Sequence, residues 1–251
     1  MKFDEHILKS KNILITGASK GIGRELSIGF SKYGANVILL GKNENELNEV
    51  YDQIKTKYNT NPMIILSDLE DLNETSAQNL QNEIFKNYSC VDGLINNASI
   101  VGKLSSVVDS SLETWQKVLK VNLISVFLLV KYLVPCMHKS HLPKIILTTC
   151  NQESNSKAFW GPYAVSKTAT KTLSEILSDE IEPISKIKVI DFDPEATRTS
   201  LRAFTHPAED PSKIKGPNSL LDCYLWMLTH NLEDDQRSFK YSDFHPQGLS
   251  T

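Results

Sequence analysis

The clearest indication of the fold is the glycine-rich stretch Thr16-Gly17-Ala18-Ser19-Lys20-Gly21-Ile22-Gly23. It joins a short apolar run at residues 12–15, typical of a buried strand, to a helical pattern at residues 24–30. Glycines let a backbone approach a pyrophosphate closely, and the free amides of a helix N-terminus favour negative charge. The pattern predicts a dinucleotide site, although Gly-x-x-x-Gly-x-Gly differs from the common Gly-x-Gly-x-x-Gly, which leaves a plain tight turn as the alternative.

A second feature is the pair Tyr163 and Lys167, within Trp160-Gly161-Pro162-Tyr163-Ala164-Val165-Ser166-Lys167. In a helix, a spacing of four places both side chains on one face. An ammonium group near a phenol favours the phenolate and lowers the phenol's pKa from its usual ~10. The pair predicts a tyrosine that exchanges protons with an alcohol or a carbonyl, but ordinary helix surfaces contain the same spacing by chance.

Composition excludes several classes of protein. The 251 residues, 40% of them hydrophobic, can form the core of a single α/β domain over residues 1–251. A net charge of −3, with both signs mixed along the chain, argues against nucleic acid as a partner. The four cysteines show no paired spacing, and the N-terminus carries acids where a secretory signal would be apolar. We therefore expect a cytoplasmic protein.

Strand-like runs alternate with helical patterns along the chain. This alternation predicts a Rossmann-like, doubly wound parallel sheet with helices on both faces, an α/β fold. Three prolines in residues 198–217, after the last strand, predict a substrate flap near the carboxyl edge of the sheet, where ligands bind. The strand-like runs lie at residues 13–15, 37–40, 63–66, 93–96, 144–148 and 186–192, and the helical patterns at 44–58, 75–87, 111–138 and 163–182, with Asn43 and Ser111 as N-caps.

The most apolar stretch, residues 121–137, has the composition of a membrane span. Asn122 and Lys131 interrupt it and its length is marginal, so we interpret it as a buried or interface helix and expect no membrane partner. His138 and His141 follow it without a cluster of carboxylates or thiols. Two histidines alone do not make a metal site, and we expect no metal.

Several motifs occur together in a familiar order. The glycine-rich turn is followed by Asn96-Asn97-Ala98, Asn122 and the Tyr163/Lys167 pair, at the separations typical of the short-chain dehydrogenase/reductase family. The resemblance to this family covers nearly the whole chain. Within the family, the chain is most similar to the bacterial YciK-type oxidoreductases. That finer resemblance rests on Trp160-Gly161-Pro162-Tyr163, Thr197-Arg198-Thr199, Glu209-Asp210-Pro211 and Tyr224-Leu225-Trp226.

The resemblance implies roles for individual residues. Tyr163 would be the general acid or base, Lys167 would lower its pKa and hold the nicotinamide ribose, and Asn122 would anchor a proton-relay water. Without this context, the residues implied to contact the cofactor are ordinary caps and turn residues. Besides Tyr163 and Lys167, they are Gly17, Ser19, Lys20, Gly21, Ile22, Gly23, Asp68, Leu69, Asn96, Ala98, Pro194, Thr197 and Thr199.

The cofactor can be argued from charge. An acid after the second strand would bind the adenosine ribose of NAD(H), but Leu40 is followed by Gly41 and Lys42. Lys20 supplies a second cation, and two lysines converging on the ribose would favour the 2′-phosphate of NADP(H). We therefore predict NADP(H) over NAD(H); the alternative is that both lysines are solvated surface charges.

Three positions depart from the family pattern. The family's catalytic serine, thirteen residues before the tyrosine, falls on Cys150, and a thiol is a weaker hydrogen-bond donor than a hydroxyl. Ser99 replaces the glycine of Asn-Asn-Ala-Gly, and Glu195 replaces the glycine of a Pro-Gly pair beside the nicotinamide. Two hypotheses follow: an NADP(H)-dependent oxidoreductase with Tyr163 and Cys150 at its catalytic centre, or a catalytically impaired relative that binds nucleotide or another protein.

The substrate is not readable beyond a small-molecule carbonyl or alcohol. Arg198, Arg202 and His206 could bind an anion, but arginine is mostly exposed, which favours simple surface charges. The family resemblance implies a homodimer or a homotetramer. We expect the apolar helix at residues 121–137 and the helix of Tyr163 to form its contacts.

Overall fold

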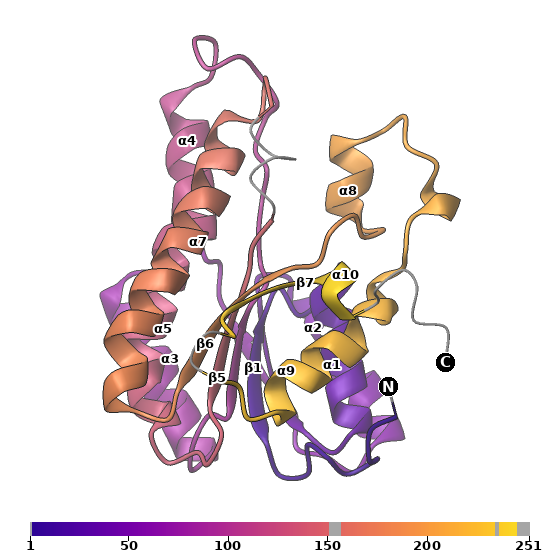
Figure 1. The fold of residues 1–251 in the computed structure, drawn as a ribbon, viewed down its shortest axis with the longest axis vertical. Coiled ribbons are helices and arrows are strands. Elements are labelled where there is room, and N and C mark those ends of the chain that lie inside the picture. Colours follow the sequence, from indigo (N-terminus) through magenta and orange to yellow (C-terminus); the bar gives the residue numbers. More distant parts are fainter. Residues whose placement is uncertain (1, 151–156, 234–235, 245–251) are drawn as a thin grey trace.

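One parallel sheet runs through the centre of the molecule (Figure 1). The structure is a computed structural model that describes residues 2–150, 157–233 and 236–244. Within them, the strand order is β3-β2-β1-β4-β5-β6-β7, and every neighbouring pair is parallel. The predicted parallel sheet is confirmed, and the ends of the six predicted strands shift by two residues at most. The strands are β1 (Asn12–Thr16), β2 (Asn36–Gly41), β3 (Met63–Leu66), β4 (Gly93–Asn96), β5 (Lys144–Thr148), β6 (Lys188–Asp193) and β7 (Ser238–Lys240).

Two helices begin at the capping residues predicted from the sequence. The Asn43 side chain accepts a hydrogen bond from Glu46 N, and the Ser111 side chain accepts one from Thr114 N. Both N-caps are therefore confirmed. The described helices are α1 (Gly21–Lys32), α2 (Glu44–Lys57), α3 (Glu74–Asn87), α4 (Leu112–Leu119), α5 (Ser125–Met137), α7 (Gly161–Ile181), α8 (Ser200–Thr205), α9 (Leu221–Thr229) and α10 (Tyr241–Phe244), with shorter turns η1 (Lys120–Ile124), η2 (Glu182–Ile184), η3 (Pro211–Lys213) and η4 (Pro217–Leu220).

Successive residues of the central strands face opposite helical layers. Ile13 and Ile15 of β1 belong to the core shared with α1, α2 and α9. Leu14, between them, belongs to the core shared with α3, α5 and α7. These two groups of helices flank the sheet in Figure 1. A strand covered on both faces needs apolar side chains at every position, which explains the continuous apolar runs in the sequence.

The predicted helix at residues 111–138 is a continuous helical segment with a π-helical turn inside it. α4 ends at Leu119, η1 covers the next five residues, and α5 continues to Met137. A π turn inserts one residue and re-aims the side chains around it, and such turns are common at functional sites. Asn122 lies in this turn and is 2% exposed.

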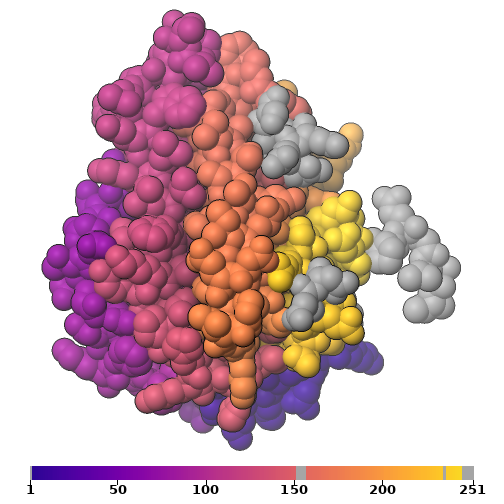
Figure 2. All heavy atoms as spheres, turned by 60° about the vertical axis from the view of Figure 1, so that its left-hand side comes forward, coloured from indigo at the N-terminus to yellow at the C-terminus, as the bar shows by residue number. Residues whose placement is uncertain are grey.

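The same segment, Leu112–Met137, is long and apolar enough to cross a membrane by length and composition alone. Half of its most apolar window is buried inside the protein, where α5 packs on α3. The outer surface formed by α4, α5 and α7 is seen in Figure 2, with the pink and orange helices adjoining. This burial agrees with the expected core or interface helix.

The chain after β6 contains elements that the sequence patterns did not predict. The expected flap consists of α8 and η3, joined by loops, and α9 then returns to pack on α1. β7 extends the sheet beyond β6, with Phe239 opposite Phe192. Its three residues include a single apolar side chain, too few for a strand pattern.

Candidate active site

A cleft of about 670 Å³ lies at the carboxyl ends of the strands. Its walls come from the last residues of several strands and from the segments that follow β1 to β6, and β7 contributes its last residue, Lys240. The sheet order reverses at β1, which lies between β2 and β4. In open α/β sheets, the crevice at such a switch point is where ligands bind.

The glycine-rich turn forms one end of the cleft. Gly17 and Gly21 have φ of 67° and 51°, in the left-handed region that favours glycine. A Cβ atom on Gly23 would lie 2.2 Å from the carbonyl oxygen of Gly17, so only glycine lets the helix approach the turn this closely. α1 starts after Lys20 without a side-chain cap, so its first amides point out of the helix uncapped. This cradle fits a pyrophosphate.

Most of the predicted cofactor residues line the cleft, although they come from six different segments of the chain. The exceptions are Gly23, which packs the turn, and Asn96, whose side chain is turned into the protein. Asn96 is 5% exposed, and its amide nitrogen and oxygen have no hydrogen-bond partner among the described residues. The predicted residues that line the cleft are Gly17, Ser19, Lys20, Gly21, Ile22, Lys42, Asp68, Leu69, Ala98, Tyr163, Lys167, Pro194, Thr197 and Thr199.

Asn97, and not Asn96, faces the cleft. Its side-chain amide donates to the carbonyl oxygen of Thr16 at 3.1 Å, and its main-chain N donates to the Thr16 hydroxyl at 2.9 Å. These bonds join the ends of β1 and β4 at the switch point. The alternation of side chains along β4 could have indicated that neighbouring residues face opposite sides.

Tyr163, Lys167 and Cys150 meet at the other end of the cleft. The sulfur of Cys150 lies 3.7 Å from the Tyr163 hydroxyl, and Lys167 Nζ lies 6.0 Å from the centre of the Tyr163 ring. Lys167 Nζ donates to the carbonyl oxygen of Thr148 at 2.7 Å. The first turn of α7, with Pro162 near its start, positions the tyrosine.

The pKa of Tyr163 moves in the direction opposite to the one expected from its lysine. Burial raises the pKa of Tyr163 well above its usual value, and the neighbouring Cys150 adds to the rise. Burial also lowers the pKa of Lys167. At this buried end of the cleft both charged forms are disfavoured, and the lysine's hydrogen bond goes to Thr148 and not to the phenol.

Asn122 does not line the cleft. Its amide nitrogen donates to Ile100 O at 2.8 Å and to Ser166 Oγ at 3.0 Å, and its amide oxygen accepts from Ile100 N at 2.9 Å. Its main-chain oxygen accepts from the hydroxyl of Thr170. Asn122 thus joins the segment after β4 to α7, the helix that carries Tyr163.

The two lysines predicted to bind the 2′-phosphate both line the cleft, and each forms an ion pair with a carboxylate. Lys20 Nζ lies 2.7 Å from Glu46, in the first turn of α2, and Lys42 Nζ lies 3.3 Å from Asp68. The position after β2 carries no acid, as expected. The fold nevertheless brings an acid from another segment to each lysine.

Ser99 and Glu195, two of the departures from the family pattern, also line the cleft. The Ser99 hydroxyl is buried, with no hydrogen-bond partner among the described residues. Glu195 has φ of 53°, the conformation that a glycine would adopt without strain. Its carboxylate accepts a hydrogen bond from Ser242 at 2.8 Å, on α10, which ties this side chain to the C-terminal helix.

The three residues of the flap that could bind an anion, Arg198, Arg202 and His206, differ in whether they line the cleft. Arg198 is exposed and lies outside the cleft, as a surface charge would. Arg202 and His206 line the cleft, so for them the surface interpretation is wrong. The His206 ring packs 5.5 Å from the ring of Trp160, which packs 5.6 Å from the ring of Tyr163.

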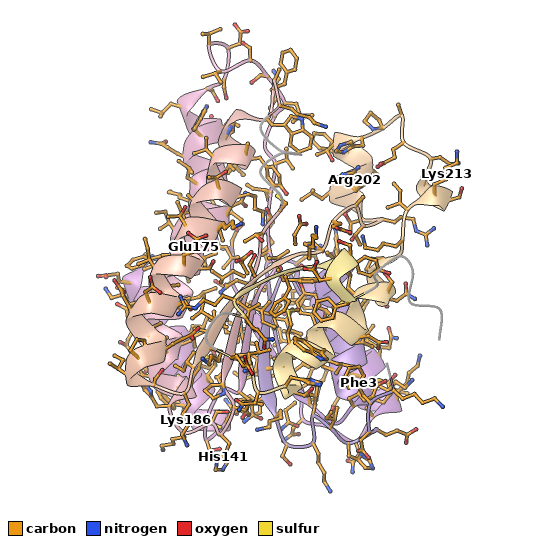
Figure 3. All side chains as sticks on the ribbon, viewed as in Figure 1. Phe3, His141, Glu175, Lys186, Arg202 and Lys213 are labelled. Atoms are coloured by element: carbon orange, nitrogen blue, oxygen red, sulfur yellow. The ribbon has the colours of Figure 1, made fainter. Side chains whose placement is uncertain are left out.

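Figure 3 places Arg202 at the end of the sheet opposite to His141 and Lys186. His141 is therefore remote from the cleft, and His138 does not line it either. Among residues 2–150, 157–233 and 236–244, no group of three or more histidines, cysteines or acids is arranged to hold a metal ion.

Comparison with known proteins agrees with this geometry. The family model described as short chain dehydrogenase matches residues 11–210. An uncharacterized oxidoreductase of Escherichia coli K12, YciK, is 35% identical over 224 residues, which are 89% of this chain and 88% of the relative. The predicted family and its YciK-like subgroup are confirmed.

Solved structures show the same fold. A short chain dehydrogenase structure from Shigella flexneri 2a, complexed with NADP, is 34% identical, with a TM-score of 0.87 over 94% of this chain and 99% of that one. One from Escherichia coli CFT073, complexed with NADPH, is 33% identical, with a TM-score of 0.89 over 95% and 99% of the two chains. The chain therefore belongs to the short-chain dehydrogenase family.

Proposed function

We propose that this protein is an NADP(H)-dependent oxidoreductase that reduces the carbonyl group of a small molecule, a ketone to a secondary alcohol or an aldehyde to a primary alcohol, and catalyses the reverse reaction. One observation carries the proposal: the buried Tyr163 hydroxyl and the glycine-rich turn that fits a pyrophosphate are the two ends of one cleft. Membership in a family of oxidoreductases supports it.

The cofactor would occupy the cleft along the carboxyl ends of the strands. Complexes of two relatives with NADP and NADPH support this choice. When bound, the cofactor supplies or accepts a hydride. In our proposal, the residues from Gly17 to Ile22 hold the pyrophosphate, Lys20 and Lys42 hold the 2′-phosphate, and Asp68 and Leu69 contact the adenine. Ala98, Pro194, Thr197 and Thr199 line the path towards the nicotinamide.

Tyr163 is the proton donor of the reduction. Because burial raises its pKa, the hydroxyl keeps its proton at neutral pH and can donate it to a carbonyl oxygen that gains negative charge. The Cys150 thiol, 3.7 Å from that hydroxyl, is the second and weaker donor to the same oxygen. Lys167, held by Thr148 O, lies where its ammonium form stabilises the tyrosinate that remains.

Asn122 acts as a positioning residue in this scheme. Its amide groups are occupied by Ile100 and Ser166, so it holds α7 against the segment after β4. A relay water would then bind to main-chain atoms of the π turn and not to the Asn122 amide. Loss of these bonds would displace Tyr163 and not remove a reacting group.

Two properties of the protein as a whole complete the proposal. We infer a single domain over 1–251 whose 198–217 flap selects the substrate, and a homodimer or homotetramer formed through α5 and α7. Ile124 in the π turn before α5, Phe127 on α5 and Ile176 on α7 are each nearly half exposed, which is unusual for large apolar side chains. Cys90, Cys136 and Cys223 form no disulfide bond among the described residues, as in proteins of a reducing cytoplasm.

The first test is equilibrium binding of NADPH and of NADH, followed by NADPH consumption with a set of aldehydes and ketones. We expect tighter binding of NADPH, turnover of a carbonyl substrate, and loss of turnover in Tyr163→Phe with NADPH binding unchanged within about threefold. Binding without turnover, also in Cys150→Ser, would instead establish the catalytically impaired relative. Absence of binding by either cofactor would contradict both the cofactor and the reaction.

A further inference from the structure

One cation of α8 is fixed at the substrate end of the cleft, and nothing in the proposed reaction uses it. We propose that Arg202 binds the carboxylate of an anionic carbonyl substrate, an oxo acid whose carbonyl lies at Tyr163. The inference rests on the proposed function and names the substrate class that this site selects.

The ion pair with Glu209 orients Arg202 and leaves half of its guanidinium available. Arg202 Nε and Nη2 donate to the two carboxylate oxygens of Glu209 at 2.6 and 2.8 Å. A guanidinium carries five N–H donors in two forks, and this contact uses one fork. The Nη1 atom of Arg202 has no partner among the residues that the structure describes. The fork that contains Nη1 can therefore donate to a second carboxylate. Glu209, which does not line the cleft, holds the guanidinium in place.

The neighbours of Arg202 place it in the same cleft as Tyr163. The hydroxyl of Thr199 caps α8, and Thr199 is also the nearest neighbour of Gly21 in the glycine-rich turn, so the helix starts beside the cofactor cradle. Arg202, Thr205 and His206 then face the cleft. The charge of Arg202 is near enough to Tyr163 to oppose the rise in the pKa of that hydroxyl.

Aromatic rings line the space between the two ends. The rings of Tyr163, Trp160 and His206 follow one another with centroid separations of 5.6 and 5.5 Å. Such a wall favours a flat apolar body between the carbonyl and the carboxylate. Burial and the charges of Arg202 and Lys157 lower the pKa of His206, so its ring is neutral at pH 7 and above. Arg202 and Lys157 then supply the positive charge at this end of the cleft.

The experiment compares 4-carboxybenzaldehyde with 4-nitrobenzaldehyde, which have the same shape and differ in charge. A charge-assisted hydrogen-bond pair contributes about 1.5–3 kcal/mol, so we expect Arg202→Gln to lower kcat/KM for the carboxylate roughly 10- to 100-fold, mainly through KM. Turnover of the nitro compound should change less than about threefold. Arg202→Lys keeps the charge without the fork, so its kcat/KM for the carboxylate should lie between the values of the wild type and of Arg202→Gln. Arg198→Gln, which removes an arginine outside the cleft, should match the wild type.

Binding of terephthalate, measured by calorimetry with and without NADP⁺, gives a readout that needs no turnover. We expect wild-type protein to bind it at least about tenfold more tightly than Arg202→Gln. Equal binding, no binding, or equal loss of both aldehydes in Arg202→Gln would overturn the inference. If neither aldehyde is reduced but terephthalate binding depends on Arg202, the anion site is supported and the proposed reaction is contradicted. If the nitro compound is reduced but terephthalate is not bound, the proposed reaction is supported and the anion site is contradicted.

Discussion

The sulfur of Cys150 lies 3.7 Å from the phenolic oxygen of Tyr163, within hydrogen-bonding range for a thiol. The position thirteen residues before the tyrosine is thus in contact with it, although the sequence supplies a thiol where the family supplies a hydroxyl. The contact also contributes to the raised pKa of Tyr163. The chemistry of this pair can be tested by replacing Cys150 and by measuring how the reaction depends on the protonation of Tyr163.

Replacement of the thiol should accelerate the reaction. A serine hydroxyl is a better donor to a developing oxyanion, and loss of one such donor costs roughly a hundredfold or more, so Cys150→Ser should raise kcat for carbonyl reduction about 10- to 100-fold. The measurement is NADPH consumption under saturating aldehyde. Cys90→Ser, at a cysteine outside the cleft, is the matched control. An unchanged kcat in Cys150→Ser, with Tyr163→Phe inactive, would show that the thiol is not a donor.

The pH dependence should differ between the two directions of the reaction. Reduction needs the protonated Tyr163, and because its pKa is raised, kcat/KM for reduction should stay level through neutral pH and fall only above pH ~10. Oxidation of an alcohol needs the deprotonated form and should rise over the same range. In Cys150→Ser the fall should move to lower pH, since Cys150 helps to raise the pKa. A reduction profile that falls near pH 7 would contradict this assignment.

The ion pair between Lys20 and Glu46 should limit the affinity for NADPH. The two side chains are 2.7 Å apart, so a 2′-phosphate must compete with the carboxylate for the ammonium. We expect Glu46→Gln to tighten NADPH binding about 3- to 10-fold and to leave NADH binding unchanged, and Lys20→Gln to weaken NADPH binding alone. Fluorescence titration measures both. Glu49→Gln, at an exposed acid of the same helix, is the control. An equal gain in NADPH affinity in Glu49→Gln would show that the effect comes from the overall charge of the protein and not from the Lys20–Glu46 ion pair.

Lys144 should destabilise the folded protein at neutral pH. It is 0% exposed, its Nζ has no hydrogen-bond partner among the described residues, and burial lowers its pKa to about 8. The unfolded chain, with an ordinary lysine pKa of ~10.4, binds more protons between these values, so stability should rise as pH increases from about 8 to about 10.

Lys144→Met should therefore raise the free energy of unfolding at pH 7 by about 1–3 kcal/mol and remove this rise with pH. Urea unfolding at pH 7 and pH 10 measures both effects. Lys188→Met is the contrasting variant, because Lys188 is paired with the buried Glu182 at 3.0 Å and its loss should destabilise the fold. A destabilised Lys144→Met would show that the amine is satisfied in solution.

Much of the fold could be predicted from local patterns. The continuous apolar runs of β1 and β2 reflect burial on both faces, and Asn43 and Ser111 mark helix starts because their side chains can cap only at that position. β7 escaped prediction because Ser238–Lys240 owes its strand conformation to pairing with β6 and not to its own composition. The π turn at Asn122 likewise leaves no pattern in the sequence.

Six strands of the sheet, the glycine-rich turn, the Tyr163/Lys167 pair and the family can be predicted from the chain alone, because each depends on residues close together in the chain or on motif order. The charges of the site depend instead on the folded arrangement, which places Glu46 beside Lys20 and Glu209 beside Arg202 and buries Tyr163, so that its pKa rises. Ionisation and ion pairing depend on burial and on neighbours that the fold brings from other elements, and local sequence patterns do not encode these distances.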